Sequence, residues 1–219
     1  MTRQAALFDF DGTLADTFPF FLRTFDQVAD RFGFRRRDHE TTEQMRGLDA
    51  RALMRHHQVP TWKVPFIARH VRALMGLHLD ELALFPGIAP ALHALADGGI
   101  ALGLVTSNAR ANVAAVLGHA LFARFAHVEC GISMFGKASK LRRLVRRARV
   151  APQSTLFVGD ELRDADAARA AGIAFGAVAW GYTRPDALMS RRPDEVFAHP
   201  TELARLGEPV PASLVSFLR

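Results

Sequence analysis

Two aspartates one residue apart, Asp9 and Asp11, follow a short apolar run. A carboxylate can act as a covalent nucleophile. A second, protonated carboxyl can give a proton to a leaving oxygen and then act as a base toward water. Gly12 permits a turn that would let both groups reach one substrate. The pair is therefore a candidate catalytic site, although a helix-capping aspartate in a turn would give the same local pattern.

Two more acidic residues, Asp160 and Asp164, follow another apolar run that ends at Gly159. With Asp9 and Asp11 they would form an oxygen-rich site of the kind that Mg²⁺ prefers. A capping box at a helix start would explain one of these acids but not the full set. We therefore expect the four aspartates to hold Mg²⁺.

A third group of polar residues, Thr106, Ser107 and Asn108, ends a further apolar run. Hydroxyl and backbone N–H groups at a helix N-terminus suit a phosphate oxygen. Lys137, one of only three lysines, stands near the start of an expected helix. Its charge would offset that of phosphate and carboxylate groups. Each signal is weak alone, and an exposed lysine is the simpler explanation of Lys137.

The elements that must position these residues alternate along the chain. Apolar runs predict buried strands at 5–8, 100–105, 155–158 and 174–179, and weaker ones at 127–130 and 195–198. Helical patterns occupy 88–97, 109–118 with Asn108 as N-cap, 138–149 and 164–171. This alternation predicts an α/β fold with a parallel sheet and right-handed crossovers. Ligands bind at the carboxyl edge of such sheets, where the polar residues gather.

The segment 18–83 has a different pattern, with helices expected at 18–33, 41–57 and 64–79 and no convincing strand. It lies between the first strand and the rest of the α/β pattern. We therefore expect a helical cap at 18–83, inserted in a core formed by 1–17 and 84–219. Arg46 in this cap could bind a substrate carboxylate with two hydrogen bonds, although a solvated arginine is the simpler explanation.

The composition argues against several other classes of protein. The chain has 219 residues, a net charge of +6 and one cysteine, which excludes an intrachain disulfide framework. The arginines are spread along the chain without a nucleic-acid motif, and no apolar run reaches the roughly 20 residues that a membrane-spanning helix needs. No secretory signal is visible. We expect a cytoplasmic monomer or homodimer with no nucleic-acid or membrane partner.

The ordered motifs resemble the haloacid dehalogenase-like superfamily, specifically its phosphoglycolate-phosphatase-like branch. The motifs that carry the resemblance are Asp9–Leu14 with Asp16-Thr17, Thr106, Lys137, and Gly159-Asp160 with Asp164. The resemblance implies a Rossmann-like core with a helical cap inserted after the first strand. The third motif departs from the branch, because alanine follows Lys137 where proline is common. This departure leaves Lys140 as a rival for the same role.

The resemblance also implies a function, an Mg²⁺-dependent phosphatase for a small phosphorylated metabolite such as phosphoglycolate. Asp9 would attack phosphorus to form an aspartyl-phosphate, and Asp11 would protonate the leaving oxygen and then activate water. Thr106 and Lys137 would bind phosphoryl oxygens. Mg²⁺ would contact Asp9, the Asp11 carbonyl and Asp160, with Asp164 completing the shell. Positioning and charge stabilisation are the main requirements of phosphoryl transfer.

Three other functions remain open. A haloacid dehalogenase needs no acid at the second position of the first motif, so Asp11 argues against it. A sugar-phosphate mutase, which returns the phosphoryl group to its substrate, has no distinguishing feature in the sequence. A non-enzymatic relative that binds a partner through the cap would not need the complete set of acids. Release of inorganic phosphate with Mg²⁺ would separate these classes.

Overall fold

The computed structural model describes residues 3–37, 42–133 and 136–208. Within these ranges, six parallel strands form one sheet in the order β5-β4-β1-β6-β7-β8. The strands are β1 (Ala5–Phe8), β4 (Ala101–Val105), β5 (Phe125–Glu129), β6 (Thr155–Gly159), β7 (Ala174–Val178) and β8 (Glu195–Phe197). The expected α/β class is confirmed, and each predicted strand lies within two residues of an observed one.

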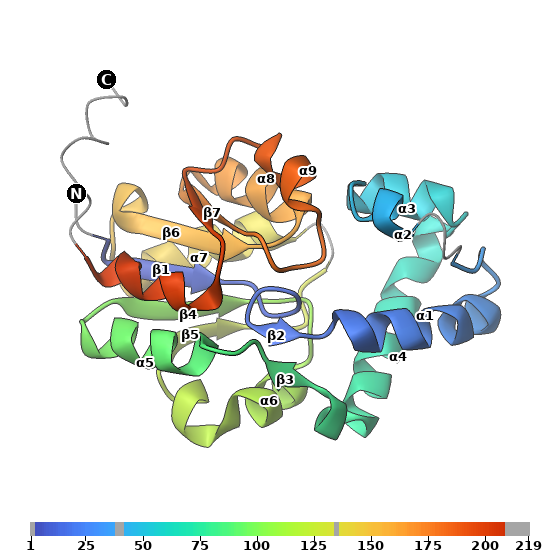
Figure 1. Ribbon diagram of the computed structural model, residues 1–219, viewed down its shortest axis with the longest axis horizontal. Helices are drawn as coiled ribbons and strands as arrows, with labels where there is room; N and C mark the ends of the chain where they lie inside the picture. The colour runs from blue at the N-terminus through green and yellow to red at the C-terminus, as the bar shows by residue number, and fades with distance from the viewer. Residues whose placement is uncertain (1–2, 38–41, 134–135, 209–219) are drawn as a thin grey trace.

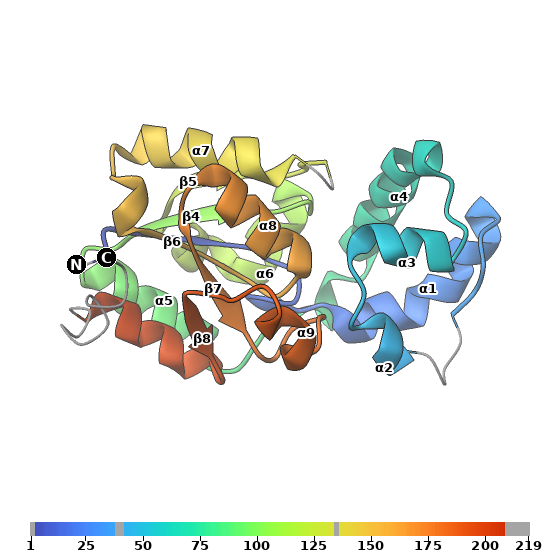
Figure 2. The ribbon, with the colours of Figure 1, turned by 90° about the horizontal axis from the view of Figure 1, so that it is seen from above.

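Helices cover both faces of the sheet, as Figure 2 shows. One face packs against α7 (Lys137–Ala148), α8 (Leu162–Ala171) and the short α9 (Pro185–Met189). The other packs against α5 (Ile88–Asp97), α6 (Arg110–Phe122) and the 3₁₀ segment η4 (Pro200–Gly207). Successive β1 side chains alternate between these two apolar clusters, with Leu7 in the first and Phe8 in the second. Burial on both faces explains why the strands are continuously apolar.

The helices of residues 18–77 lie beside the carboxyl edge of the sheet (Figure 1). They are α1 (Phe18–Phe32), α2 (Thr42–Met45), α3 (Ala50–His56) and α4 (Val64–Leu77), with short 3₁₀ segments η1 (Thr61–Lys63) and η2 (Leu79–Glu81). A further 3₁₀ segment, η3 (Pro152–Ser154), precedes β6. The carboxyl edge of the sheet, where the polar motif residues lie, therefore faces these helices.

Three local expectations are wrong. The single helix expected at 41–57 is two helices, because Asp49 accepts a hydrogen bond from the backbone N–H of Ala52 at 2.8 Å and starts α3 anew; residue 41 lies outside the described ranges. A short antiparallel pair, β2 (Ala15–Asp16) with β3 (Ala83–Leu84), joins the two regions where no strand was expected. The N-cap of α6 is Ala109, not Asn108.

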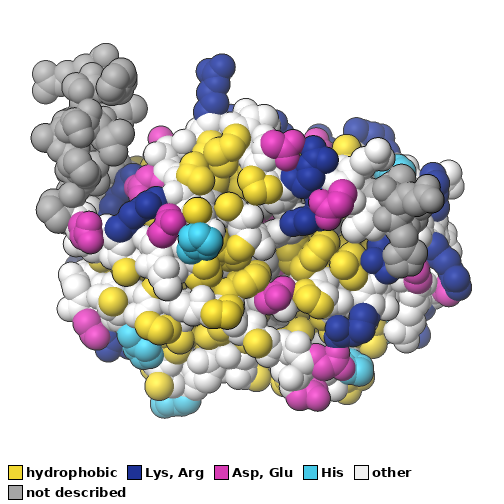
Figure 3. All heavy atoms as spheres, viewed as in Figure 1, with side chains coloured by type: hydrophobic (Ala, Val, Ile, Leu, Met, Phe, Trp, Pro, Cys, Tyr) yellow, Lys and Arg dark blue, Asp and Glu magenta, His cyan; other side chains and the backbone are white. Residues whose placement is uncertain are grey.

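The surface carries both signs of charge. On the face seen in Figure 3, basic and acidic side chains are interspersed, with apolar side chains between them. Among the described residues, no helix is long and apolar enough to span a bilayer.

Candidate active site

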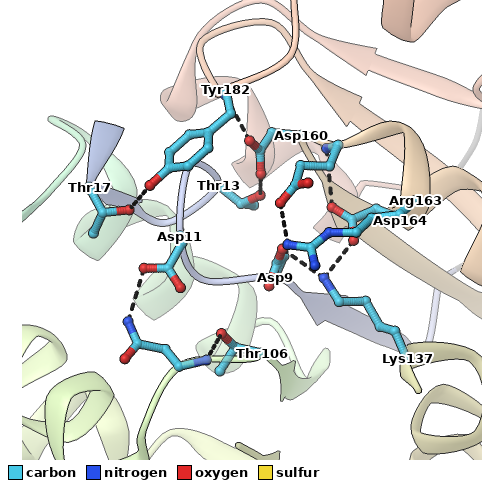
Figure 4. Close-up of polar contacts among 12 residues, drawn as sticks. Asp9, Asp11, Thr13, Thr17, Thr106, Lys137, Asp160, Arg163, Asp164 and Tyr182 are labelled. Carbon is cyan, nitrogen blue, oxygen red and sulfur yellow. Dashed lines mark hydrogen bonds and ion pairs between the residues drawn. The ribbon is translucent and has the colours of Figure 1, made fainter. Parts of the chain in front are cut away.

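Asp9 and Lys137 form the centre of the polar cluster at the sheet edge. Asp9 follows β1, and its side chain is 4% exposed. Lys137, the first residue of α7, places Nζ 2.7 Å from Asp9 Oδ2 and 2.5 Å from Asp164 Oδ1 (Figure 4). Burial disfavours the charged amine, but Asp164 and Asp9 outweigh that effect and raise the pKa of Lys137. The lysine is therefore a fixed positive charge between two carboxylates.

The two candidate lysines occupy different environments. Lys140 lies about one turn further along α7, where Nζ is 3.5 Å from Glu129 Oε2 and the side chain is one-third exposed. The side chain of Lys137 is 5% exposed and contacts the aspartates of the cluster. The geometry therefore brings Lys137 into the candidate site and leaves Lys140 outside it.

Asp9, Asp160 and Asp164 form a group of buried carboxylates whose oxygens lie within 4.8 Å of one another. Thr13 Oγ1 donates to Asp160 Oδ1 at 2.7 Å, and the backbone N–H of Tyr182 donates to Asp160 Oδ2 at 2.8 Å. Burial raises the pKa of Asp9 to about 7 against the opposing effect of Lys137, and burial and nearby acids also raise that of Asp160. A divalent cation relieves this repulsion, and the all-oxygen donor set fits Mg²⁺.

Asp164 serves two purposes. Its Oδ1 pairs with Lys137, and its Oδ2 accepts the backbone N–H of Glu161 at 3.2 Å, which completes a capping box at the start of α8. The capping role and the candidate metal role are therefore compatible in one side chain.

Asp11 lies apart from the three clustered carboxylates. Its Oδ1 accepts a hydrogen bond from Asn108 Nδ2 at 2.9 Å. Burial raises the pKa of Asp11 to about 6, although hydrogen bonds from Asn108 and Thr17 act in the opposite direction. A carboxyl of this kind carries a proton more readily than an ordinary aspartate does. The two acids of the first motif thus have different partners, a lysine for Asp9 and a side-chain amide for Asp11.

The second motif forms a compact turn after β4. The buried Thr106 accepts the backbone N–H of Asn108 on Oγ1 at 3.0 Å. Asn108 Oδ1 in turn accepts the backbone N–H of Ala109 at 2.7 Å, so this side chain holds the turn and Asp11 together. The carbonyl of Ser107 accepts Arg72 Nη1 of α4 at 3.2 Å. All three predicted residues therefore lie at the edge that faces the helices.

Two glycines allow the site to be this crowded. A Cβ at Gly12, where φ is +76°, would lie 2.3 Å from Asp160 Oδ2. A Cβ at Gly181 would lie 2.1 Å from the Asp160 Cβ. Both positions bring backbone against the buried carboxylate at a distance that no side chain would permit.

Arg46 connects the cap helices to the loop after β7. Its Nε donates to the carbonyl of Tyr182 at 2.9 Å, and Nη2 donates to that of Gly181 at 3.0 Å. Nη1 lies 3.0 Å from Glu43 Oε1, and the guanidinium stands over the ring of Phe18. These backbone and side-chain groups engage each of its three nitrogens, and the substrate carboxylate expected from the sequence stays a prediction.

The sequence analysis assigns no role to two side chains near the site, Arg163 and Tyr182. Arg163, in the first turn of α8, pairs with Glu161 and reaches toward Asp9 (Figure 4). Its buried Nε has no hydrogen-bond partner among the described residues. Tyr182 places its hydroxyl 2.7 Å from Thr17 Oγ1. For Arg163, the run of acids around it was the available signal, because a buried acidic cluster needs a compensating cation.

A cavity of about 350 Å³ lies between the Asp11 side of the site and the helices of residues 18–77, and its lining does not include Asp9, Lys137, Asp160 or Asp164. Asp11, Ser107, Asn108, Glu161 and Arg163 line its core end. The cap end is lined mainly by apolar side chains of α1, α3 and α4. The cavity therefore brings Asp11 and apolar side chains of these helices to the same space.

Comparisons with known proteins agree with the geometry. The phosphoglycolate phosphatase of Synechococcus elongatus is 34% identical over 201 residues, which cover 91% of this chain and 95% of the relative. The tyrosine-protein kinase PtkA of Mycobacterium tuberculosis is 28% identical over 94% of this chain and 72% of its own length. A solved structure from Lactobacillus plantarum, provisionally described as a phosphoglycolate phosphatase, is 25% identical and superposes with a TM-score of 0.80 over 94% of this chain and all of its own. A family model for haloacid dehalogenase-like hydrolases matches residues 6–178, and the chain therefore belongs to that family.

Proposed function

We propose that the protein is an Mg²⁺-dependent phosphatase that hydrolyses a phosphate monoester through an aspartyl-phosphate on Asp9. One observation carries the proposal. The buried carboxylate of Asp9 lies 2.7 Å from the buried amine of Lys137, and oxygens of Asp160 and Asp164 lie close enough to share a cation with it. Asp11 lies outside this group, and its pKa is raised. The similarity to a named phosphoglycolate phosphatase supports the same reaction class.

In this proposal Asp9 attacks phosphorus and the bond to the leaving oxygen breaks. Lys137 and Thr106 bind the phosphoryl oxygens, and Lys137 also keeps Asp9 oriented. Asp9, Asp160 and Asp164 would hold the Mg²⁺, whose charge offsets the repulsion between carboxylates and phosphate.

Asp11 handles the protons in both halves of the reaction. Its protonated carboxyl gives a proton to the leaving oxygen, and the resulting carboxylate then takes a proton from the water that attacks the aspartyl-phosphate. Hydrolysis frees Asp9 and inorganic phosphate and returns the proton to Asp11. The raised pKa of Asp11 suits this alternation, because both protonation states are accessible near neutral pH.

The test is a panel of phosphate monoesters assayed for inorganic phosphate. We expect release with Mg²⁺, loss of release in EDTA and recovery when Mg²⁺ is restored. Full activity in EDTA would contradict the metal assignment. Transfer of the phosphoryl group to a second sugar phosphate without phosphate release would indicate a mutase instead. Because one relative is named a tyrosine kinase, a parallel reaction with ATP and a tyrosine peptide should give no phosphotyrosine.

A further inference from the structure

The cavity has two ends of opposite character. Its core end is lined by Asp11, Glu161 and Arg163, and Asp11 is the proton donor of the proposed reaction. The cap end is apolar over most of its lining, with side chains contributed by three helices. Representative residues are Phe21, Phe25, Leu53, Met54, Ile67 and Val71. Ligand sites of this kind are largely apolar with a few placed polar groups, and cavities of 300–1,000 Å³ are typical of them.

The cap helices do not fill this space with one another. Among the described residues, α3 has no buried side chain, and the only buried one on α4 is Met75. The buried cluster in this region, Phe20 with Met75 and Leu82, lies near the junction with the core. Apolar helix faces normally bury against a partner at the density of a protein interior. Here they face the cavity, so an apolar guest would supply the missing contact.

The basic groups near the cavity mouth already have partners. Arg46 donates to the carbonyls of Gly181 and Tyr182, and Arg72 donates to that of Ser107. Arg163 stands at the phosphate end and pairs with Glu161. Each of these three guanidiniums is thus held by a protein group, and Arg163 Nε, which has no hydrogen-bond partner among the described residues, lies at the phosphate end.

The lining contains two other basic groups, His57 and Arg37. Burial lowers the pKa of His57, whose Nδ1 lies 3.0 Å from the carbonyl of Arg35, so the ring is neutral near pH 7. The backbone N–H of Arg37 is bonded to Asp26, which lies about 12 Å along α1 from Phe18 at 1.5 Å per residue. The side chain of Arg37 also lines the cavity, and its buried Nε has no hydrogen-bond partner among the described residues.

We infer that the preferred substrate is a phosphate monoester whose leaving group carries a bulky apolar portion, an aryl or medium-length alkyl group, seated between α1, α3 and α4. This inference rests on the proposed function and names its substrate class. It differs from the small acidic substrate that the family resemblance implies. The leaving group would cover the apolar faces and exclude water from Asp9 and Asp11.

The first experiment compares straight-chain alkyl phosphates from methyl to octyl with phosphoglycolate. The reacting bond is nearly constant along the alkyl series, so differences in kcat/KM report the contact made by the chain. We expect kcat/KM to rise about fourfold per added methylene until the cavity is filled. Hexyl phosphate should exceed phosphoglycolate by about tenfold or more. A flat series, or a preference for phosphoglycolate, would overturn the inference.

A matched pair of variants locates the effect. Ala68 of α4 lines the cavity, whereas Ala73 on the same helix is exposed and does not. Ala68→Phe should lower the ratio of kcat/KM for hexyl over methyl phosphate by about tenfold, because the ring occupies the space that the chain needs. Ala73→Phe should leave that ratio unchanged. An equal fall in both variants would mean that α4 acts on overall stability, and the inference would be wrong.

A binding measurement separates this inference from the proposed function. Hexylphosphonate and methylphosphonate cannot be hydrolysed, and their affinities are measured by calorimetry with Mg²⁺ present. Tighter binding of hexylphosphonate with a negative heat-capacity change supports binding of the alkyl chain at the apolar end of the cavity, even if no ester is hydrolysed. Hydrolysis of every ester with equal affinity for both phosphonates would leave the phosphatase proposal standing and overturn the inference.

Discussion

The two ends of the cavity are built on different principles. At the core end, nearly every polar group has a defined partner, as Lys137 has in Asp9 and Asp164. At the cap end, apolar side chains such as Phe25 and Ile67 are only half-buried and face open space. The first arrangement fixes the positions of reacting groups, and the second selects by shape and hydrophobicity. Changes at the core end should therefore alter the rate for every substrate, and changes at the cap end should alter the choice among substrates.

The largest effect is expected at the core end. Asp9→Asn removes the nucleophile, so turnover should fall by roughly 10⁴-fold or more for all esters, and no phosphoenzyme should be trapped. Acid quenching of a reaction with labelled substrate measures both. Turnover near the wild-type level would show that Asp9 is not the nucleophile.

Folding of that variant needs its own control. Because burial raises the pKa of Asp9 to about 7 in the folded protein, its charged form opposes folding above the unfolded value of 3.8. That cost is present at pH 7 and disappears as the pH falls toward 4. Asp9→Asn removes this cost and also one carboxylate partner of Lys137, so the melting temperature of the variant in EDTA at pH 7 is measured beside that of the wild type.

The next effect separates the two lysines. Lys137→Met removes the charge beside Asp9 and Asp164, and kcat/KM should fall about 10²–10³-fold for short and long esters alike. Lys140→Met is the matched control, and its loss should stay within a fewfold because its partner is Glu129. The reverse order of losses would assign the third-motif role to Lys140.

A smaller effect is expected where the two regions meet. Arg46→Ala removes two hydrogen bonds to the carbonyls after β7, so closure of the cap over the site should weaken. We expect a loss of about tenfold, equal for phosphoglycolate and for phenyl phosphate. Steady-state kinetics on both substrates provides the measurement. A loss confined to phosphoglycolate would restore the carboxylate-binding role predicted from the sequence.

The smallest effect lies outside both regions. The hydrogen bond from Arg143 lowers the pKa of Glu129 in the folded protein below 4.5, so its charge stabilises the fold above that pH and the contribution is lost in acid. Glu129→Gln should reduce the free energy of unfolding by about 1 kcal/mol at pH 7, since its basic partners are partly exposed. Urea titrations should show the difference shrink as the pH falls below 4.5. Catalysis at either pH should not change beyond that stability effect.

Much of the core could be predicted because its signals are local. Buried parallel strands are continuous apolar runs, and the runs at 5–8 and 155–158 end where the acids begin. The pairing of β2 with β3 could not be predicted, because two residues are too few to show the alternation of apolar and polar side chains that marks a strand. Asn108 looks like an N-cap, yet its side-chain NH₂ is used by Asp11, a contact between residues 97 positions apart.

The cap end was harder to predict for a different reason. Phe25, Leu53 and Ile67 have the spacing of ordinary core residues on amphipathic helices, and nothing in their types indicates a cavity. Whether three such faces meet or stand apart is a tertiary property. Arg163 differs, because its main partners Glu161 and Asp164 stand beside it in the sequence and only Asp9 comes from a distant segment.

The antiparallel pair of β2 and β3 has a consequence for evolutionary exchange. Ala15 pairs with Leu84 and Asp16 with Ala83, so the two chain ends of the helical segment leave the core side by side. Paired strands lie about 4.8 Å apart, and an insertion whose ends already meet adds little closure entropy as it lengthens. A different set of helices could be grafted between these strands without moving a residue of the sheet. The β2–β3 pair thus allows the inserted helices, and with them the substrate selectivity, to change during evolution while the reaction centre stays the same.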